Sequence, residues 1–224
     1  SNNIIVDLKK LKIDDNKIIQ IPNTVLLKKI KKYSFKKKNV HLRLLTVARF
    51  AEKKKGFDFI SKLGNQLNNK IEYKWTVIGR DSHKINQYRF VRNNPKNFEA
   101  IPEIKNTNED FFPHSKLIKY YKSADIYIHL SRIESFGISL IEAMSANLPI
   151  LAINSKGSNE LLKENNNEYF FDFKKNNFIK KINFIKRKKL NLTKMKKYNK
   201  KYIKNFDLET STNKLIKIYH KLIN

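Results

Sequence analysis

Two glutamates flank a glycine in a short stretch of the chain, Glu134 to Glu142, where residue types and spacing suggest chemistry. The two positions differ by 142 − 134 = 8, so Glu134 would precede a helix and Glu142 would lie about two turns along it. A helix start carries unpaired N–H groups and the positive end of the helix dipole. Gly137 lets the backbone approach a bulky anion without a Cβ in the way. The stretch therefore predicts a phosphate-binding site at Gly137, Ile138 and Ser139.

The two carboxylates cannot share one task. Phosphate would repel both, but Glu134 and Glu142 could accept hydrogen bonds from hydroxyls on either side of a diphosphate. A nucleotide-sugar has hydroxyls in those two places. The alternative is structural: Glu134 is then an acidic residue near a helix N-terminus and Glu142 an exposed helical glutamate.

Local sequence predicts the elements that hold this site. Residues Ala124–Leu130 are apolar enough for a buried strand, and Ser135 offers an N-cap side chain. Helical spacing then runs through Ile138, Ile141 and Met144. Asn147 is expected to end the helix, because Asn tolerates the left-handed conformation.

A second set of polar residues follows another predicted strand, His41–Ala48. Arg49 would lie at the carboxyl end of that strand, where doubly wound sheets bind ligands. Lys55 comes six positions later, before the helix predicted from Gly56 to Leu67. In a chain with 48 Lys and Arg, exposure to solvent is the alternative for any one cation.

Strand and helix patterns alternate along the rest of the chain. Further strands are expected at Lys70–Gly79, Phe98–Ile101, Pro149–Ile153 and Tyr169–Phe173. The ends predict a helix at Ile4–Leu11, a strand at Lys17–Ile21, a solvated Lys-rich linker over residues 28–38, and basic helices from Lys174 that end in an amphipathic helix. The alternation predicts an α/β domain with a doubly wound parallel sheet.

Composition restricts the class of protein. The 224 residues can bury one sizeable core, and the absence of Cys excludes disulfides and thiolate metal sites and favours a cytoplasmic location. No apolar run reaches membrane-spanning length. The formal net charge of +28 indicates either an anionic partner or a biased coding sequence rich in Lys, Asn and Ile codons. A basic nucleic-acid-binding module is the rival function, although no nucleic-acid-binding motif is present.

The string Glu134-Ser-Phe-Gly-Ile-Ser-Leu-Ile-Glu142-Ala-Met resembles the paired-glutamate signature of the retaining glycosyltransferases of family 4, which have the two-domain GT-B fold. Ser123-Ala-Asp125 and Leu148-Pro-Ile150 are also similar to that family. The resemblance implies the C-terminal, Rossmann-like half of a GT-B enzyme. That half binds the nucleotide-sugar donor.

The resemblance also implies roles for individual residues. Arg49 and Lys55 would contact the diphosphate, Glu142 the ribose and Glu134 the sugar, so that Glu134, Arg49 and Lys55 act in catalysis. The expected donor-binding set is Arg49, Lys55, Phe136, Gly137, Ile138, Ser139 and Glu142. Transfer would proceed with retention, without a metal ion or cofactor, from a UDP-, GDP- or ADP-linked sugar to a glycan or lipid-linked acceptor. A catalytically silent nucleotide-sugar sensor is a further alternative.

The match has local departures. Ala48 and Thr24 stand where the family often has Gly, and Arg80 is assigned no contact. Lys156–Glu160 resembles a Gly-rich turn, and Glu160 is left open between a sugar contact and a helix cap.

The expected organisation has three parts. They are the end of a missing N-terminal domain with a linker (1–40), the nucleotide-sugar-binding domain (41–205) and a helix crossing back to the other domain (206–224). Without the acceptor domain this chain is expected not to transfer sugar. The basic segment from Lys174 to Lys204 is expected to contact an anionic membrane peripherally.

Overall fold

A six-stranded parallel sheet forms the centre of the computed structural model, which describes residues 2–34, 41–105, 113–134, 136–162, 170–173, 175–187 and 192–223. The strand order is β3-β2-β1-β4-β5-β6. The strands are β1 (Leu42–Val47), β2 (Tyr73–Ile78), β3 (Phe98–Ile101), β4 (Ile126–His129), β5 (Ile150–Ile153) and β6 (Phe170–Phe171). Each strand lies within a predicted segment, and the doubly wound α/β fold is confirmed.

The central strands are buried on both faces, as parallel strands covered by helices must be. All four residues of β4 are buried. In β1 the consecutive Leu44 and Leu45 are each 1% exposed but belong to different hydrophobic cores. The sheet therefore separates two cores.

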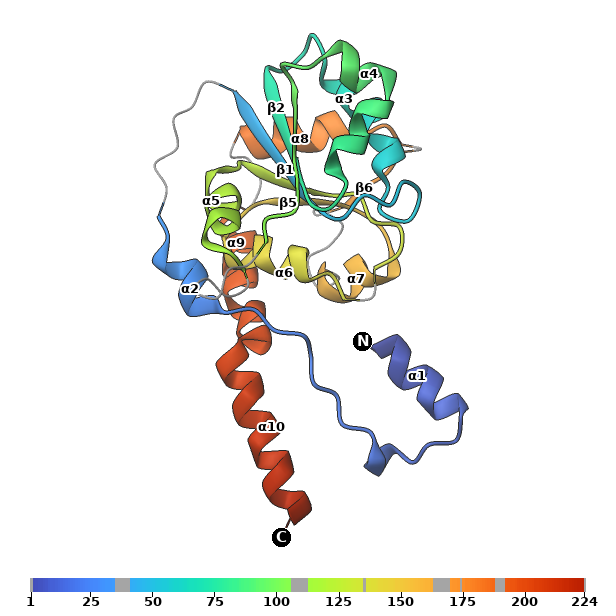
Figure 1. The fold of residues 1–224 in the computed structure, drawn as a ribbon, viewed down its shortest axis with the longest axis vertical. Coiled ribbons are helices and arrows are strands. Elements are labelled where there is room, and N and C mark those ends of the chain that lie inside the picture. The colour runs from blue at the N-terminus through green and yellow to red at the C-terminus, as the bar shows by residue number, and fades with distance from the viewer. Residues whose placement is uncertain are drawn as a thin grey trace.

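Helices cover the two faces of the sheet (Figure 1). One core is closed by α2 (Leu27–Lys32), α5 (Ser115–Ser123), α6 (Ile138–Ser145), α7 (Lys156–Leu162) and α9 (Leu192–Tyr202). The other is closed by α3 (Ile60–Leu67), α4 (Arg89–Asn93) and α8 (Phe178–Lys186), with the 3₁₀ turns Phe57–Phe59 and Ser82–Gln87. Because α3 follows β1 and α6 follows β4, the chain changes face between these adjacent strands.

The C-terminal helix α10 (Leu208–Ile223) extends away from the sheet, and α1 (Asn2–Lys10) lies apart from the helices that cover it (Figure 1). The start of α10 is fixed to the segment before α2: Val25 N–H donates to the Phe206 carbonyl at 2.8 Å, and Leu208 N–H donates to the Val25 carbonyl at 3.1 Å. Further along, Leu222 and Ile223 are 73% and 81% exposed. Nothing in the described residues covers this end of α10.

Two predictions near the N-terminus are wrong. The expected strand Lys17–Ile21 is absent, and a 3₁₀ turn at Asp15–Lys17 is followed by irregular chain. Alternating residues there have no neighbouring strand within the described residues with which to pair. The expected solvated linker over 28–38 begins as helix α2, because Leu27 and Ile30 are buried in the core while Lys28 between them is exposed. Residues 35–40 lie outside the described residues.

The segment after β5 also differs from the prediction. Lys156–Glu160, expected as a Gly-rich turn, belongs to helix α7. A Cβ on Gly157 would lie 2.6 Å from Glu134 Cβ, so Gly157 allows α7 to pack against the loop that carries Glu134. Close helix-to-loop packing explains this glycine better than turn geometry does.

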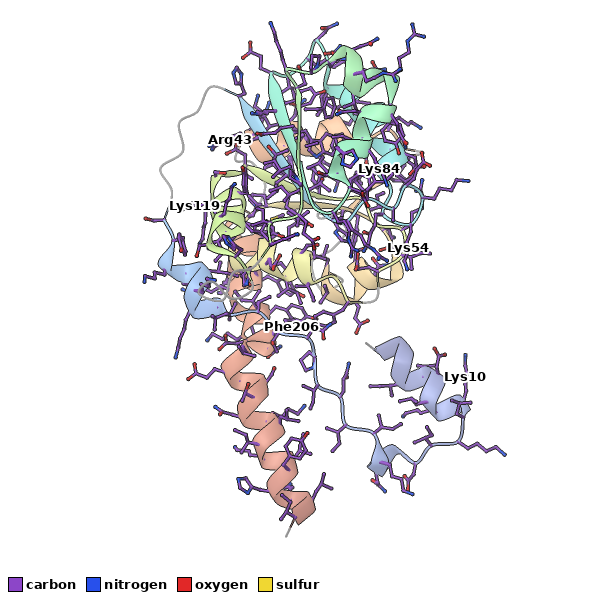
Figure 2. All side chains as sticks on the ribbon, in the orientation of Figure 1. Lys10, Arg43, Lys54, Lys84, Lys119 and Phe206 are labelled. Atoms are coloured by element: carbon purple, nitrogen blue, oxygen red, sulfur yellow. The ribbon has the colours of Figure 1, made fainter. Side chains whose placement is uncertain are left out.

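Lysine side chains project from many parts of the molecule (Figure 2). The labelled Lys10, Lys54, Lys84 and Lys119 come from four different elements or loops. Positive charge is therefore spread over several parts of the surface. Within the described residues, none of the helices combines the length and the apolar character that crossing a bilayer requires.

Candidate functional site

A cavity of about 390 Å³ lies at the carboxyl ends of β1 and β4. This is the point at which the chain changes face, where doubly wound sheets bind ligands. The eight residues assigned to the donor site from the sequence all line it: Arg49, Lys55, Glu134, Phe136, Gly137, Ile138, Ser139 and Glu142. Asn23, Val47, Ala48 and Leu117 complete the lining.

The start of α6 opens onto this cavity. The N-cap is Gly137 with φ 85°, and no side chain caps the helix. Ser135, the predicted cap, lies outside the described residues. The backbone N–H groups of Gly137, Ile138 and Ser139 form no hydrogen bond within the described residues. They are therefore available to an anion.

The other end of α6 is closed as predicted. Asn147 adopts φ 62°. Its N–H donates to the Met144 carbonyl at 2.9 Å, and Leu148 N–H donates to the Ala143 carbonyl at 3.1 Å. This pair of bonds is a Schellman motif.

Glu142 is buried in the wall of the cavity, with 1% of its surface exposed. Tyr121 on α5 donates a hydrogen bond to Oε2 of Glu142 at 2.7 Å. Oε1 of Glu142 has no partner within the described residues. Burial raises the pKa of Glu142 to about 7, although the Tyr121 hydroxyl opposes the rise. The alternative that Glu142 is an exposed helical residue is wrong.

Lys55 and Glu134 form an ion pair at the mouth of the site. Lys55 Nζ lies 2.7 Å from Glu134 Oε2, and the two side chains are 15% and 12% exposed. Burial on its own would raise the pKa of Glu134, but the hydrogen bond and charge of Lys55 outweigh it and lower that pKa. The structure therefore brings together a cation and a carboxylate that were assigned separate contacts.

His129 lies behind this pair, 3% exposed, with Nε2 3.9 Å from Glu134 Oε2. Burial lowers the pKa of His129 to about 4, so the imidazole is neutral at pH 7. Nε2 of His129 has no hydrogen-bond partner within the described residues.

Arg49 is exposed at the cavity and forms no hydrogen bond or ion pair within the described residues. The loop behind it is fixed by Phe50 N–H, which donates to the Arg80 carbonyl at 2.8 Å. Arg80 itself is exposed and does not line the cavity.

The loops after β1 and β4 are bound to each other. Gly56 has φ 70°, and a Cβ there would collide with the backbone of Leu130. The backbone N–H of Arg132 donates to the Lys54 carbonyl at 3.1 Å. The guanidinium of Arg132 donates two hydrogen bonds to the Asp58 carboxylate, at 2.6 and 2.7 Å. These contacts fix Lys55 relative to Glu134.

Phe136 and Glu160 connect the site to the base of α10. Phe136 packs edge-on against Phe206, with ring centroids 5.6 Å apart. Phe206 lies where α10 leaves the domain (Figure 2). Glu160 lines a separate cavity of about 450 Å³ with Phe136 and Tyr202. It is the fifth residue of α7, so it is not a helix cap. It also does not line the cavity between Arg49 and Glu142.

Sequence reasoning missed Tyr121 and Arg132, and also Tyr127, whose hydroxyl donates to Ser139 Oγ at 2.9 Å. One signal for Tyr121 was present: spacing along α5 places it on the buried face with Leu117 and Ile118, and a buried tyrosine hydroxyl needs a partner. The identity of that partner could not be read from local sequence. No group of three His, Cys, Asp or Glu in the described part of the chain is placed to hold a metal ion.

Comparison with solved structures identifies the fold. A glycosyltransferase from Rickettsia africae is 19% identical with a TM-score of 0.75, and the match covers 95% of this chain and 59% of that one. The pneumococcal O-GlcNAc transferase GtfA, in complex with UDP and GlcNAc, is 16% identical with a TM-score of 0.71, covering 100% and 44%. A variant of Staphylococcus aureus TarM, in complex with fondaparinux, alpha-GlcNAc-glycerol and UDP, is 18% identical with a TM-score of 0.66, covering 96% and 41%. The chain thus spans about half the length of these proteins.

Sequence comparison identifies the family. A search of proteins of curated function returns no sequence match. The family model described as glycosyl transferases group 1 matches residues 28–202, which is well over half of the chain and includes the eight residues assigned to the donor site from the sequence. The chain therefore belongs to the glycosyl transferases group 1 family.

Proposed function

We propose that the cavity binds the diphosphate of a nucleotide-sugar, and that this chain is the donor-binding domain of a retaining, metal-independent glycosyltransferase. The observation that carries the proposal is that one cavity brings together groups suited to an anion and groups suited to hydroxyls. Arg49, the carboxylates of Glu134 and Glu142, and α6 N–H groups without a partner among the described residues all line it. That set matches a diphosphate joined to hydroxyl-bearing groups.

In this proposal the site acts on the leaving group. As the bond between sugar and diphosphate breaks, negative charge grows on the diphosphate, and Arg49, Lys55 and the α6 start stabilise it. Lys55 Nζ bonds Glu134 Oε2 at 2.7 Å, which fixes the position of its ammonium group at the cavity. These cations take the neutralising role, and no metal ion or other cofactor enters the mechanism.

The two carboxylates have different tasks. Glu142 is expected to accept hydrogen bonds from the ribose hydroxyls, which favours its charged form and lowers its pKa on binding. Glu134, in the loop before α6, is expected to accept hydrogen bonds from the donor sugar. The UDP present in the GtfA and TarM complexes makes UDP-sugars the first donors to test, followed by GDP- and ADP-sugars.

The acceptor is proposed to be a glycan or a lipid-linked sugar, held by a further domain on the side of α10. Positioning of an acceptor can supply about 7–11 kcal/mol of the barrier, so donor binding by this chain does not imply transfer. The basic α9 region is proposed to rest on an anionic membrane surface. The family assignment and the cavity both argue against the nucleic-acid-binding alternative.

A thermal-shift screen tests the proposal. UDP, GDP, ADP and their glucose conjugates are added to the wild type, to Arg49→Ala and to Arg80→Ala. At least one ligand should stabilise the wild type, by about 2.7 kcal/mol at 100 times its Kd. Arg49→Ala should lose most of that shift, whereas Arg80→Ala, an exposed arginine outside the cavity, should keep it. No shift with any of the six ligands would contradict the proposal.

A further inference from the structure

Tyr121 lies beneath the candidate site and outside the set of residues that line it. It is on α5, 2% exposed, and its hydroxyl donates to Oε2 of Glu142 at 2.7 Å. The same hydroxyl lies 3.2 Å from the Ser139 carbonyl oxygen. Tyr121 therefore contacts α6 at two of the positions proposed to bind the donor.

The carboxylate that Tyr121 holds has one free oxygen. Oε1 of Glu142 is buried and has no partner within the described residues, although Glu142 lines the cavity. A buried carboxylate oxygen without a hydrogen bond is unfavourable, and a hydroxyl entering the cavity would satisfy it.

We propose that Tyr121 is a positioning residue for donor binding: by holding Oε2 of Glu142 it leaves Oε1 to accept a hydrogen bond from a ribose hydroxyl of the nucleotide. The inference rests on the proposed function. It adds a residue from a different helix that contacts no ligand and acts through Glu142.

The other described ionisable groups around Glu142 do not take the place of Tyr121 in holding Oε2. The Tyr127 hydroxyl from β4 is 2.9 Å from Ser139 Oγ and bonds that atom rather than Glu142. Arg49, Lys55 and Glu134 line the same cavity, and Lys55 is paired with Glu134. On the helices packed against α6, Lys29 of α2 is half-buried, and four lysines of α9 are exposed to solvent: Lys196, Lys197, Lys200 and Lys201.

The positioning role of Tyr121 predicts how donor affinity depends on pH. Burial raises the pKa of Glu142 to about 7, and the Tyr121 hydrogen bond holds it below the value that burial alone would set. A protonated carboxyl is a poorer acceptor, so donor affinity should rise with pH through about 7. Without the Tyr121 hydroxyl the pKa rises, and the midpoint moves to higher pH. A purely structural role would lower affinity without moving the midpoint.

The test is calorimetry between pH 6 and 9 with UDP-, GDP- and ADP-glucose. These conjugates are chosen because a sugar diphosphate, unlike a free nucleoside diphosphate, has no terminal phosphate that titrates near pH 7. Tyr121→Phe should bind about tenfold more weakly at pH 7, with a midpoint about one pH unit higher. Tyr73→Phe is the control, because Tyr73 is also buried and its hydroxyl bonds a backbone carbonyl in α3, away from the cavity.

A second measurement works without any ligand. In carbon NMR, the carboxyl resonance of Glu142 should titrate with a midpoint near pH 7 in the wild type and at a higher pH in Tyr121→Phe. Equal midpoints in the two proteins, by either method, would overturn the role of Tyr121. If the wild type binds none of the three conjugates, the proposed function fails, and the NMR midpoints still decide whether Tyr121 sets the charge of Glu142.

Discussion

One carboxylate oxygen of Glu142 has no partner in the described part of the chain, and the other accepts a hydrogen bond from the Tyr121 hydroxyl. Burying an ionised carboxyl with a single hydrogen bond opposes folding. Such a residue is expected where function requires a charged acceptor. Glu142 should therefore reduce stability in the empty protein and contribute to binding once a ligand pairs with it.

Glu142→Gln should separate these two effects. A carboxyl whose pKa rises from 4.5 to about 7 on folding stabilises the folded state fully below pH 4.5, and this stabilisation is lost as pH rises through 7. Glutamine cannot ionise, so the variant should be more stable than the wild type at pH 8 by up to about 3 kcal/mol. The difference should vanish near pH 4.5, and urea unfolding at the two pH values measures it.

His129 does not disturb that comparison. Its pKa falls from 6.5 to about 4 on folding, so its contribution is lost as pH falls below 6.5, in the wild type and the variant alike. If Glu142→Gln is no more stable than the wild type at pH 8, then the buried Glu142 carboxylate does not destabilise the ligand-free domain.

The sequence predicted the residues that line the cavity better than it predicted the partners of those residues. The spacing of Glu134, Gly137 and Glu142 is local, and it indicated an anion site between two carboxylates. The ion pair between Lys55 and Glu134 joins positions 79 apart, and the bond from Tyr121 to Glu142 joins positions 21 apart. Such pairings depend on how helices and loops pack, which a local pattern does not contain.

At the scale of elements, glycines set how closely the loops around the site approach one another. The Cβ of a Gly157→Ala variant would lie 2.6 Å from Glu134 Cβ, which would push α7 away from the loop that holds Glu134. At Gly64 an added Cβ would meet Phe90 and Phe98 at 2.7 and 2.8 Å, on the other face of the sheet.

Both Gly157→Ala and Gly64→Ala should destabilise the protein, by about 1–3 kcal/mol, because each overpacks a filled region. Only Gly157→Ala should also weaken nucleotide-sugar binding, since it displaces Glu134 and with it Lys55. Chemical denaturation and calorimetry on the two variants measure both quantities. Equal donor affinity in the two would mean that the position of the Glu134 loop does not matter for binding.

Elements were predictable where burial is symmetric and the pattern strong. All six strands of the sheet lie within segments that the sequence predicted as strands. The errors at the N-terminus fell in the chain before β1: the expected strand at Lys17–Ile21 lacks a partner, and α2 is helical because Leu27 and Ile30 reach the core. In both places tertiary packing, rather than local composition, decides the structure.

At the scale of the molecule, positive charge is distributed unevenly. From Phe173 to Phe206 the sequence has fourteen Lys and Arg and no Asp or Glu. Where α9 is described, its lysines Lys196, Lys197, Lys200 and Lys201 are exposed. Each cation near an anionic membrane surface is worth about 1 kcal/mol, so this segment should bind acidic lipid.

Vesicle co-sedimentation tests the membrane contact. The wild type should bind vesicles with acidic lipid more strongly than neutral ones, and the preference should weaken as salt is added. Replacing the four α9 lysines by Gln should abolish most of it. Replacing Lys9, Lys10, Lys12 and Lys17 by Gln removes the same charge elsewhere and should have a smaller effect. Equal effects of the two sets of substitutions would indicate that vesicle binding follows from the lysine-rich composition of the whole chain rather than from α9.

Calorimetry with a matched pair of ligands tests the central claim, that a nucleotide-sugar lies across the cavity between Glu142 and Glu134. The nucleoside diphosphate that stabilises the wild type most, and its glucose conjugate, are titrated into the wild type, Glu134→Ala and Glu142→Ala. Glu142→Ala should weaken both ligands, because ribose is common to both. Glu134→Ala should spare the free nucleotide, since Lys55 remains for the diphosphate, and weaken only the conjugate. Equal losses for both ligands in both variants, or no binding by the wild type, would contradict this account.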